Sequence, residues 1–432
     1  MKVEEYLKRF DSVTKDPSLD AMEYFMKEFD NPHKKTKFIH IAGTNGKGSV
    51  CEMINNILIN AGYKVGKYMS PHLIRYNERI MINNNEITDE DMDEILQEID
   101  EKVARYNKTH EIPVKQFEIV TTLAFVYFSR KKCDFVVLET GLGGTYDCTN
   151  IADGLISIIT SIGYDHMNIL GNTIEEITNN KAGIIKKNND TIMCYQEKIT
   201  DIIAKKCKEE NNTLHIIKKE DISNYHFNQE IQSIDYKEYK NIEVNLKGIA
   251  QIYNASIAIE CMQILNNKGY EVKEDAIRTG LKTVLHHARF ETLEKFPRIV
   301  FDGGHNEDAI KNLKNTINMY YPEERKIYIL SILKTKDYKT VIRLLTEDKK
   351  GIFIFTSGND HEKYVSKEEL YLEAQKHLNN NIYKKELKDA IAFAKDMYEN
   401  DVIMIIGSFY IYSDVLIFLG KRWQNKQVKL YL

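Results

Sequence analysis

A lysine inside a glycine-rich segment is the clearest chemical signal in the sequence. Lys47 stands among three glycines in residues 43–49, which read GTNGKGS. Glycines remove side chains that would keep backbone N–H groups away from phosphate oxygens, and the lysine adds a positive charge. An apolar run at 38–42 precedes the segment, and apolar residues at helical spacing follow it. The pattern predicts a phosphate-binding loop between a strand and a helix.

This loop departs from the generic phosphate-loop pattern. The generic form has glycine five positions before the second glycine, where this chain has Ile41. It also joins lysine directly to serine or threonine, whereas Gly48 separates Lys47 from Ser49 here. The loop is therefore not the generic phosphate-binding pattern.

The elements that position this loop follow from apolar periodicity. Apolar runs of strand length alternate with helical patterns, which predicts a parallel sheet with crossover helices. Thr173 followed by Glu176 predicts a capping box at a helix start, which places Lys181 on the second turn of that helix or beyond. Before residue 290, we expect strands at 38–42, 64–68, 134–139 and 156–160. Helices are expected at 89–106, 118–130, 252–265 and 275–285.

The length of 432 residues predicts two domains. A break in composition at 289–297 marks the expected boundary, with a first domain over 1–290, a hinge at 291–297 and a second domain over 298–432. The predicted fold class is α/β: a mostly parallel sheet with a phosphate loop, followed by a smaller Rossmann-like domain. Strands of the second domain are expected at 298–301, 326–332, 352–356 and 402–406.

Composition excludes several classes of partner. Hydrophobic residues make up 43% and charged residues 29%, as in globular proteins, and the formal net charge of −4 gives no basic surface for nucleic acid. The N-terminus lacks the pattern of a signal peptide, and the apolar runs are too short to span a membrane. We expect a cytoplasmic, monomeric enzyme with no nucleic-acid or membrane partner and six free cysteines.

Several motifs together resemble one known family. Residues 40–49 resemble the nucleotide loop of the Mur ligase superfamily, in its folylpolyglutamate synthase/dihydrofolate synthase branch. The resemblance extends over about residues 31–415, and further signatures of that branch follow in order: Ser70 to Leu73 with Glu78 to Ile80, Glu139 to Gly144 with Asp147 to Asn150, Gly163 to Gly171, Lys181 to Ile184, Gly248 to Ala255, Arg289 with Glu291, Asp302 to Asn306, Lys336 with Asp337, and Gly407 with Ser408.

The resemblance implies an ATP-dependent ligase that activates a carboxylate as an acyl phosphate and joins it to an amine. The implied cofactors are ATP and Mg²⁺, and the implied substrates are L-glutamate and a folate or dihydropteroate. The two domains would then be an ATP-binding Mur-ligase-like domain and a glutamate-ligase domain. Residues implied to contact the nucleotide are Thr44, Asn45, Gly46, Lys47, Gly48, Ser49, Asn254, Arg289 and Asp302.

The resemblance also implies metal, catalytic and substrate residues. Glu139 is expected at the carboxyl end of a strand, where ligand sites of parallel sheets gather, and its oxygens suit Mg²⁺. By resemblance, Ser70 and His166 join it as metal ligands. The implied catalytic residues are Lys47, Lys181 and His305, with Lys181 carbamylated by CO₂ so that it becomes an anion. The implied folate-side residues are Tyr146, Asp147 and Cys148, and Phe117 is either a core residue or a surface on which a pterin stacks.

Two other functions fit parts of the sequence. One is a peptidoglycan ligase of the same superfamily, which would add an amino acid to a nucleotide-sugar peptide. The segment 70–73 and Gly48 favour the folate branch over it. The other is a switch that uses ATP only to order its domains, which would have little use for Glu139, His166 and Lys181 together.

Overall fold

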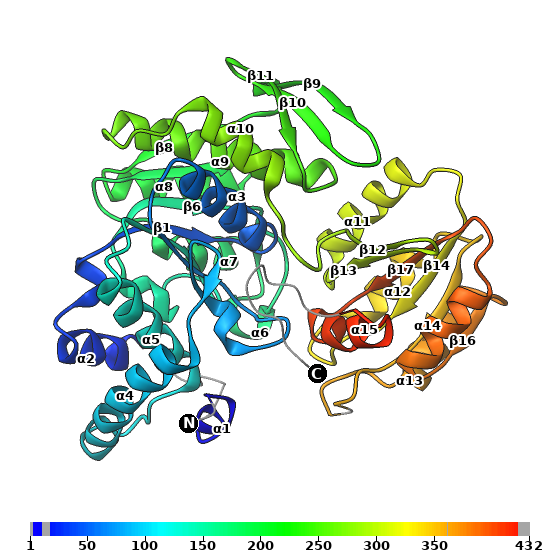
Figure 1. Cartoon of the computed structure of the whole chain (residues 1–432), viewed down its shortest axis with the longest axis horizontal. Coiled ribbons are helices and arrows are strands. Elements are labelled where there is room, and N and C mark those ends of the chain that lie inside the picture. Colours follow the sequence, from blue (N-terminus) through cyan, green and yellow to red (C-terminus); the bar gives the residue numbers. More distant parts are fainter. Residues whose placement is uncertain (1–2, 11–17, 361, 422–432) are drawn as a thin grey trace. The chain divides into compact units, whose positions relative to one another are not determined.

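The computed structural model describes residues 3–10, 18–360 and 362–421, so the ends of both expected domains, 1–2 and 422–432, lie outside the described residues. The chain forms two compact units, which are shown in Figure 1. Unit 1 comprises Met1–His226, Ser233–Val244 and Ile252–Val284, and unit 2 comprises Phe227–Gln232, Asn245–Gln251 and Leu285–Leu432.

An eight-stranded sheet forms the centre of unit 1. Its strand order is β4-β3-β2-β5-β1-β6-β7-β8, and the pairs from β2 to β8 are all parallel. The two strands at one edge, β3 and β4, are antiparallel to their neighbours. The bounds are β1 Lys37–Ala42, β2 Val65–Tyr68, β3 Ile80–Ile82, β4 Asn85–Glu86, β5 Phe135–Glu139, β6 Gly154–Ile159, β7 Asp190–Cys194 and β8 Thr213–Ile217.

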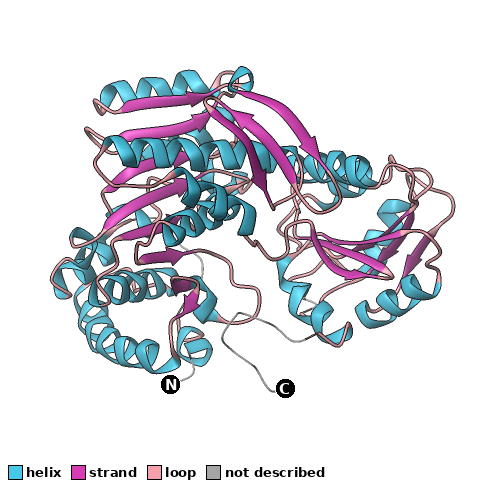
Figure 2. Ribbon diagram, turned by 45° about the horizontal axis from the view of Figure 1, so that its top comes forward, coloured by secondary structure: helices cyan, strands magenta, loops and turns pink. Residues whose placement is uncertain are grey.

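Crossover helices connect these strands and build the core of unit 1 (Figure 2). One buried cluster joins α2, α4 and α5 to the strands β1, β2 and β5, and another joins α7 and α8 to β6 and β7. The helix after the glycine-rich loop, α3, packs on α10, where Gly280 leaves no space for a Cβ because Ile57 Cα would lie 2.6 Å from it. The bounds are α1 Val3–Leu7, α2 Asp20–Glu28, α3 Lys47–Asn60, α4 Asp89–Thr109, α5 Gln116–Arg130, α6 Met167–Leu170, α7 Ile174–Lys181, α8 Ile199–Glu209, α9 Ile249–Asn267 and α10 Glu274–Thr283.

The predicted strands and helices of unit 1 are present, with ends that shift by a few residues. The capping box at Thr173 is confirmed: its hydroxyl accepts the Glu176 N–H at 3.1 Å, and the Glu176 carboxylate accepts the Thr173 N–H at 3.2 Å. The sequence reasoning missed a three-stranded sheet in the order β11-β10-β9. The outer strands β9 Ile222–Phe227 and β11 Tyr239–Val244 are mostly exposed or half-buried, and the buried middle strand β10 Gln232–Tyr236 is half polar, so none of them has the apolar run that identifies a buried strand.

Unit 2 contains a six-stranded sheet in the order β12-β13-β17-β14-β15-β16. All pairs are parallel except β12 with β13. The bounds are β12 Glu291–Lys295, β13 Arg298–Asp302, β14 Lys326–Leu330, β15 Ile352–Phe355, β16 Ile382–Lys384 and β17 Val402–Ile406, with helices α11 Glu307–Tyr320, α12 Tyr338–Leu345, α13 Lys367–Ala374, α14 Leu387–Asp396 and α15 Tyr412–Phe418.

The segment expected to be a hinge, 291–297, is instead part of unit 2. Residues 291–295 form β12, which pairs with β13 through a turn at 296–297. Two glutamates and one lysine make this segment polar, but an edge strand needs only one buried face, and Leu293 supplies it. The division between the units falls at Val284 and Leu285. Among the described residues, no helix is long and apolar enough to cross a membrane.

A cluster of charged side chains ties the edge of the large sheet to the small sheet. His215 on β8 lies 2.9 Å from Asp190 and 3.6 Å from Glu260 of α9. Lys268 forms an ion pair with Asp190, and Lys237 with Glu260. The Glu260 and Asp190 carboxylates raise the pKa of His215, although burial opposes them.

We predict that this cluster stabilises the fold more at low pH than at high pH. Folding raises the pKa of His215 above its value in the unfolded chain, about 6.5. Its contribution to the free energy of unfolding is therefore complete below about pH 6.5 and is lost as pH rises through the pKa of the folded state. Urea unfolding of wild type and His215→Gln at pH 6 and pH 8.5 measures this. The free-energy difference between the two proteins should be larger at pH 6, and a difference independent of pH would contradict the prediction.

Candidate active site

The glycine-rich loop connects β1 to α3 and is fixed by hydrogen bonds to the segment after β6. The Thr44 N–H donates to Ser161 O at 2.7 Å, and the Thr44 hydroxyl donates to Gly163 O at 3.0 Å. Gly46, just before α3, has φ of +94°, and a Cβ there would lie 2.8 Å from the Asn254 side-chain oxygen. Glycine is required for this conformation and this close approach. No side chain at position 46 therefore covers the backbone N–H groups at the N-terminus of α3.

Two lysines meet at the start of this loop. Lys47, the first residue of α3, donates to Gly43 O at 3.1 Å, and Lys181, the last residue of α7, donates to the same oxygen at 2.8 Å. Lys181 is only 4% exposed. Burial and the positive charge of Lys47 lower the pKa of Lys181 to about 7, against the opposing charges of Asp165 and Asp147. A substantial fraction of Lys181 is therefore an uncharged amine near neutral pH.

The three expected metal ligands follow the carboxyl ends of strands on either side of β1. Ser70 follows β2, Glu139 ends β5, and His166 follows β6. Glu139 is 5% exposed, and its carboxylate accepts the Ser70 N–H at 3.1 Å. The His166 side chain is 43% exposed, on a residue with φ of +51°. The structure thus places Ser70 against Glu139 and brings His166 to the same edge of the sheet.

These donors fit a magnesium–nucleotide complex better than a site built of protein alone. Among the described residues, no group of three or more histidine, cysteine, aspartate or glutamate side chains is arranged to hold a metal ion. Mg²⁺ usually takes one or two carboxylates and completes its shell with phosphate oxygens and water. Glu139, a buried carboxylate, ends the strand beside β1, with Ile41 as its partner in the sheet. The phosphate loop begins two residues after Ile41, so a phosphate held there would supply the remaining oxygens.

The turn after β5 is held by a buried carboxylate. Asp147 accepts the Leu142 N–H at 2.7 Å, and its second oxygen accepts the Thr149 N–H at 3.0 Å and the Thr149 hydroxyl. Burial raises the pKa of Asp147, and these hydrogen bonds oppose that rise. Asp147 was expected on the folate side by resemblance, and the structure shows that both of its oxygens organise the turn at 141–149.

This turn packs directly on the end of α7 and so positions Lys181. A Cβ on Gly144 would lie 2.6 Å from Lys181 O, which means that only glycine allows the approach. The Gly144 N–H donates to the Asn180 side chain at 3.0 Å, and the Thr145 N–H donates to Asn180 O at 2.8 Å. Asn180 therefore fixes the residue before Lys181 to the glycine turn.

The other two folate-side candidates differ in exposure. Tyr146 is 54% exposed, whereas Cys148 is partly buried, and burial raises the pKa of its thiol well above the usual value. Phe117, at the start of α5, lies against Gly141, where a Cβ would come within 2.4 Å of its ring. Its ring centroid is 6.2 Å from that of Tyr68. Phe117 therefore forms one aromatic wall beside the glycine turn.

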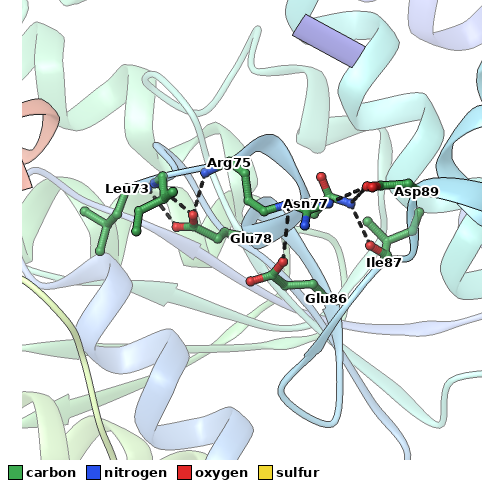
Figure 3. A network of polar contacts seen from close by, with 8 residues as sticks. Leu73, Arg75, Asn77, Glu78, Glu86, Ile87 and Asp89 are labelled. Atoms are coloured by element: carbon green, nitrogen blue, oxygen red, sulfur yellow. Dashed lines mark hydrogen bonds and ion pairs between the residues drawn. The ribbon is translucent and has the colours of Figure 1, made fainter. Parts of the chain in front are cut away.

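The loop from Ser70 to Arg79, between β2 and β3, is folded around the carboxylate of Glu78. This side chain accepts three consecutive backbone N–H groups, from Leu73 at 2.8 Å, Ile74 at 2.8 Å and Arg75 at 2.6 Å (Figure 3). Sequence reasoning assigned Glu78 no role. The available signal was an acidic residue three positions after the start of a short helical turn, which is the spacing of a capping box.

The same loop is tied to the neighbouring hairpin and helix. The Arg75 guanidinium forms ion pairs with Asp89 and with Glu86, the latter at 3.7 Å. The buried Asn77 side chain donates to Ile87 O and to Asp89, both at 2.8 Å (Figure 3). The loop that begins with Ser70 is therefore a fixed part of unit 1.

In unit 2, three predicted site residues lie together. Asp302, at the end of β13, accepts the Phe290 N–H at 2.9 Å and the Gly304 N–H at 2.7 Å. It thus joins the segment that carries Arg289 to the segment that carries His305. The Arg289 guanidinium lies 4.5 Å from the centre of the Phe409 ring, and His305 Nδ1 donates to Gly303 O at 2.8 Å. Burial raises the pKa of Asp302, and the charge of Arg289 opposes that rise.

Comparison with known proteins relates both units to ligases. Residues 41–262 match the Mur ligase middle domain, and residues 288–409 match the glutamate ligase domain of Mur ligases. A dihydrofolate synthase/folylpolyglutamate synthase of Bacillus subtilis is 33% identical over 411 residues, which cover 92% of this chain and 94% of that protein. The chain belongs to the dihydrofolate synthase/folylpolyglutamate synthase family.

Solved structures of this family have the same fold. Mycobacterium tuberculosis folylpolyglutamate synthase, solved with ADP and AMPPCP, superposes with a TM-score of 0.88 at 25% identity, covering 98% of each chain. Escherichia coli FolC, solved with DHPP and ADP, gives a TM-score of 0.85 at 26% identity, covering 97% of this chain and 98% of that one. The resemblance found in the sequence motifs is therefore confirmed at the level of family and fold.

We predict that Asp147→Ala lowers the free energy of unfolding by about 2 to 4 kcal/mol, because two buried backbone N–H groups lose their acceptor. Urea unfolding measures the change. Asp153→Ala is a matched control, since Asp153 is exposed in the same region, and it should cost about 0.5 kcal/mol or less. Equal effects of the two substitutions would show that Asp147 does not hold the turn.

Proposed function

We propose that the protein joins L-glutamate to a folate, and also to dihydropteroate, in an ATP-dependent reaction. A carboxylate oxygen of the acceptor attacks the γ-phosphorus of ATP, and ADP leaves. The glutamate amine then attacks the acyl carbon of the resulting acyl phosphate, and phosphate leaves as the amide bond forms. The observation that carries the proposal is the meeting of Lys47 and the buried Lys181 on Gly43, two residues after the strand partner of Glu139, in a member of this family.

The residues of the loop act mainly by position and charge. Phosphoryl transfer depends on holding the phosphates in line and on offsetting the charge that develops on them. Thr44, Asn45, Gly46, Gly48 and Ser49 would bind the phosphates with the backbone at the N-terminus of α3. Lys47 would turn from Gly43 O to the phosphates, and Asn254, against Gly46, would contact the nucleotide.

Ser70, Glu139 and His166 would hold Mg²⁺ together with the phosphates. The ion, when bound, neutralises charge on the phosphate oxygens. Lys181 as an ammonium would be repelled by that ion, whereas its carbamate would offer two oxygens of the type Mg²⁺ prefers. In unit 2, Arg289 and Asp302 would contact ATP, and His305 would lie near the transferred phosphate.

The enzyme test offers dihydropteroate and tetrahydrofolate separately, each with ATP, Mg²⁺ and glutamate, and identifies the products by mass. We expect ADP, phosphate and an acceptor one glutamate longer. If neither dihydropteroate nor tetrahydrofolate supports glutamate-dependent ADP release, the folate reaction is excluded. A nucleotide-sugar peptide as the sole acceptor would favour a peptidoglycan ligase.

We predict that Lys47→Ala reduces kcat by at least about 100-fold, equivalent to roughly 3 kcal/mol of lost transition-state stabilisation. The fold should persist, because the lysine contacts only carbonyl oxygens of its own loop among the described residues. Lys205→Ala, which removes an exposed lysine of α8, should leave kcat unchanged. Wild-type turnover in Lys47→Ala would contradict the assignment of the phosphate loop.

We further predict that Lys181 reacts with CO₂. Its neutral amine attacks the carbon of CO₂ and releases one proton, which leaves a carbamate anion, and the pKa of about 7 provides the neutral amine. Lys181→Ala should lose most activity and regain part of it with added acetate or formate. Lys187→Ala, which removes an exposed neighbour, should keep its activity and show no rescue.

Crystals grown with bicarbonate should show a branched side chain at Lys181. A plain ammonium group in well-resolved density at neutral pH, or full activity in Lys181→Ala, would rule out the carbamate.

A further inference from the structure

The loop Ser70–Arg79 carries two arginines with different surroundings. Arg75 forms ion pairs with Asp89 and Glu86, so its charge is matched by carboxylates of the protein. Arg79 forms no ion pair with any acidic side chain of the described residues. Its Nε donates to His72 Nδ1 at 2.9 Å, and its guanidinium lies 4.8 Å from the centre of the Tyr76 ring.

These contacts orient the guanidinium of Arg79 and leave its far end available. The bond to His72 uses the single N–H of Nε, and within the described part of the chain Nη1 and Nη2 form no hydrogen bond. The two terminal nitrogens of such a planar group match the two oxygens of a carboxylate. Arg79 is half-buried, so its charge is partly shielded from water but can still be reached by a ligand.

Several contacts hold the residues around Arg79 in place. The ring centroids of His72 and Tyr76 are 4.4 Å apart, and Gln116 at the start of α5 donates to the Tyr76 hydroxyl at 3.1 Å. The Met69 N–H donates to Arg79 O at 3.1 Å, which closes the base of the loop. Together with Glu78, these contacts fix the position of the guanidinium before any ligand arrives.

Arg79 lies away from the phosphate loop. It immediately precedes β3, at the edge of the sheet that carries Ser70, and β2 and β5 lie between β3 and the strand of the phosphate loop, β1. Three strand spacings of about 4.8 Å put β3 roughly 14 Å from β1, too far for Arg79 to hold the phosphates bound after β1. Phe117, which lies against Gly141 of the glycine turn, is the residue after Gln116, whose side chain donates to Tyr76.

A folate acceptor differs from dihydropteroate by its glutamate, which has two carboxylates. One is activated in the reaction, and the other is a spectator that needs a cation. We propose that Arg79 binds this spectator carboxylate and thereby determines how well the enzyme accepts folates relative to dihydropteroate. The inference rests on the proposed function, and it names a residue that acts on only one of its two acceptors.

The test compares acceptors with and without glutamate. For Arg79→Gln, kcat/KM with tetrahydrofolate should fall about 10- to 100-fold because KM rises. This is the range for the loss of a charged hydrogen-bonded pair. With dihydropteroate, kcat/KM should change less than about 3-fold, because this acceptor has no glutamate carboxylate. Arg79→Lys, which keeps a point charge but not the planar fork, should lie between wild type and Arg79→Gln, and it serves as the second variant if Arg79→Gln folds poorly. Arg75→Gln is the matched control on the same loop, and it should affect both acceptors equally.

Binding gives a readout that does not require turnover. Tetrahydrofolate and tetrahydropteroate differ only in the glutamate, so Arg79→Gln should weaken binding of the first and spare the second. Equal losses for both ligands, or no loss for either, would overturn the proposal. Failure of wild type to use any folate or pteroate acceptor would instead refute the proposed function, so the two failures are distinguishable.

Discussion

The carbonyl oxygen of Gly43 accepts hydrogen bonds from two lysines, and this arrangement sets the electrostatics of the site. Two ammonium groups on one oxygen repel each other, which is one reason why the pKa of the buried Lys181 falls to about 7. The region therefore favours an anion. Phosphates bound at the loop would offset the two positive charges. Loss of the proton from Lys181 would also remove the repulsion between the two lysines.

The rest of unit 1 fixes the distance between these two lysines. Asp147 holds the glycine turn, the turn packs on the end of α7, and α7 ends at Lys181. Glycines are required where backbones touch, since a Cβ at Gly144 or Gly183 would lie within 2.6 Å of neighbouring atoms. The expected metal ligands and the loop around Glu78 follow strands of the same sheet, so one scaffold positions the lysines, the acidic residues and Arg79.

Much of this scaffold could be predicted because its signals are local. The phosphate loop combines glycines, lysine and a following helical pattern within 20 residues, and the capping box at Thr173 is complete within four. The central strands of the two large sheets are mostly apolar on both faces, which identifies β1 and β5 of unit 1 and β17 of unit 2 directly.

The remaining features depend on contacts between distant segments. Lys181 and Gly43 are separated by 138 positions, so no pattern in the sequence reports their hydrogen bond. The edge strand β12 and strand β9 of the small sheet expose polar residues and resemble loops. Glu78 was visible as part of a family signature, but its three backbone partners became apparent only with the fold. Asp147, expected near the folate, uses both oxygens within its own turn.

The surroundings of the six cysteines have a practical consequence for spectroscopy. Four of the thiols are buried, and burial raises the pKa of the two partly buried ones, at Cys148 and Cys194. Thiols react with maleimides and similar reagents as thiolates, so the native chain should label slowly. A single cysteine introduced at an exposed position such as Tyr146 would then be the fast-reacting group. A fluorophore or spin label placed there would report on the glycine turn without first removing the native thiols.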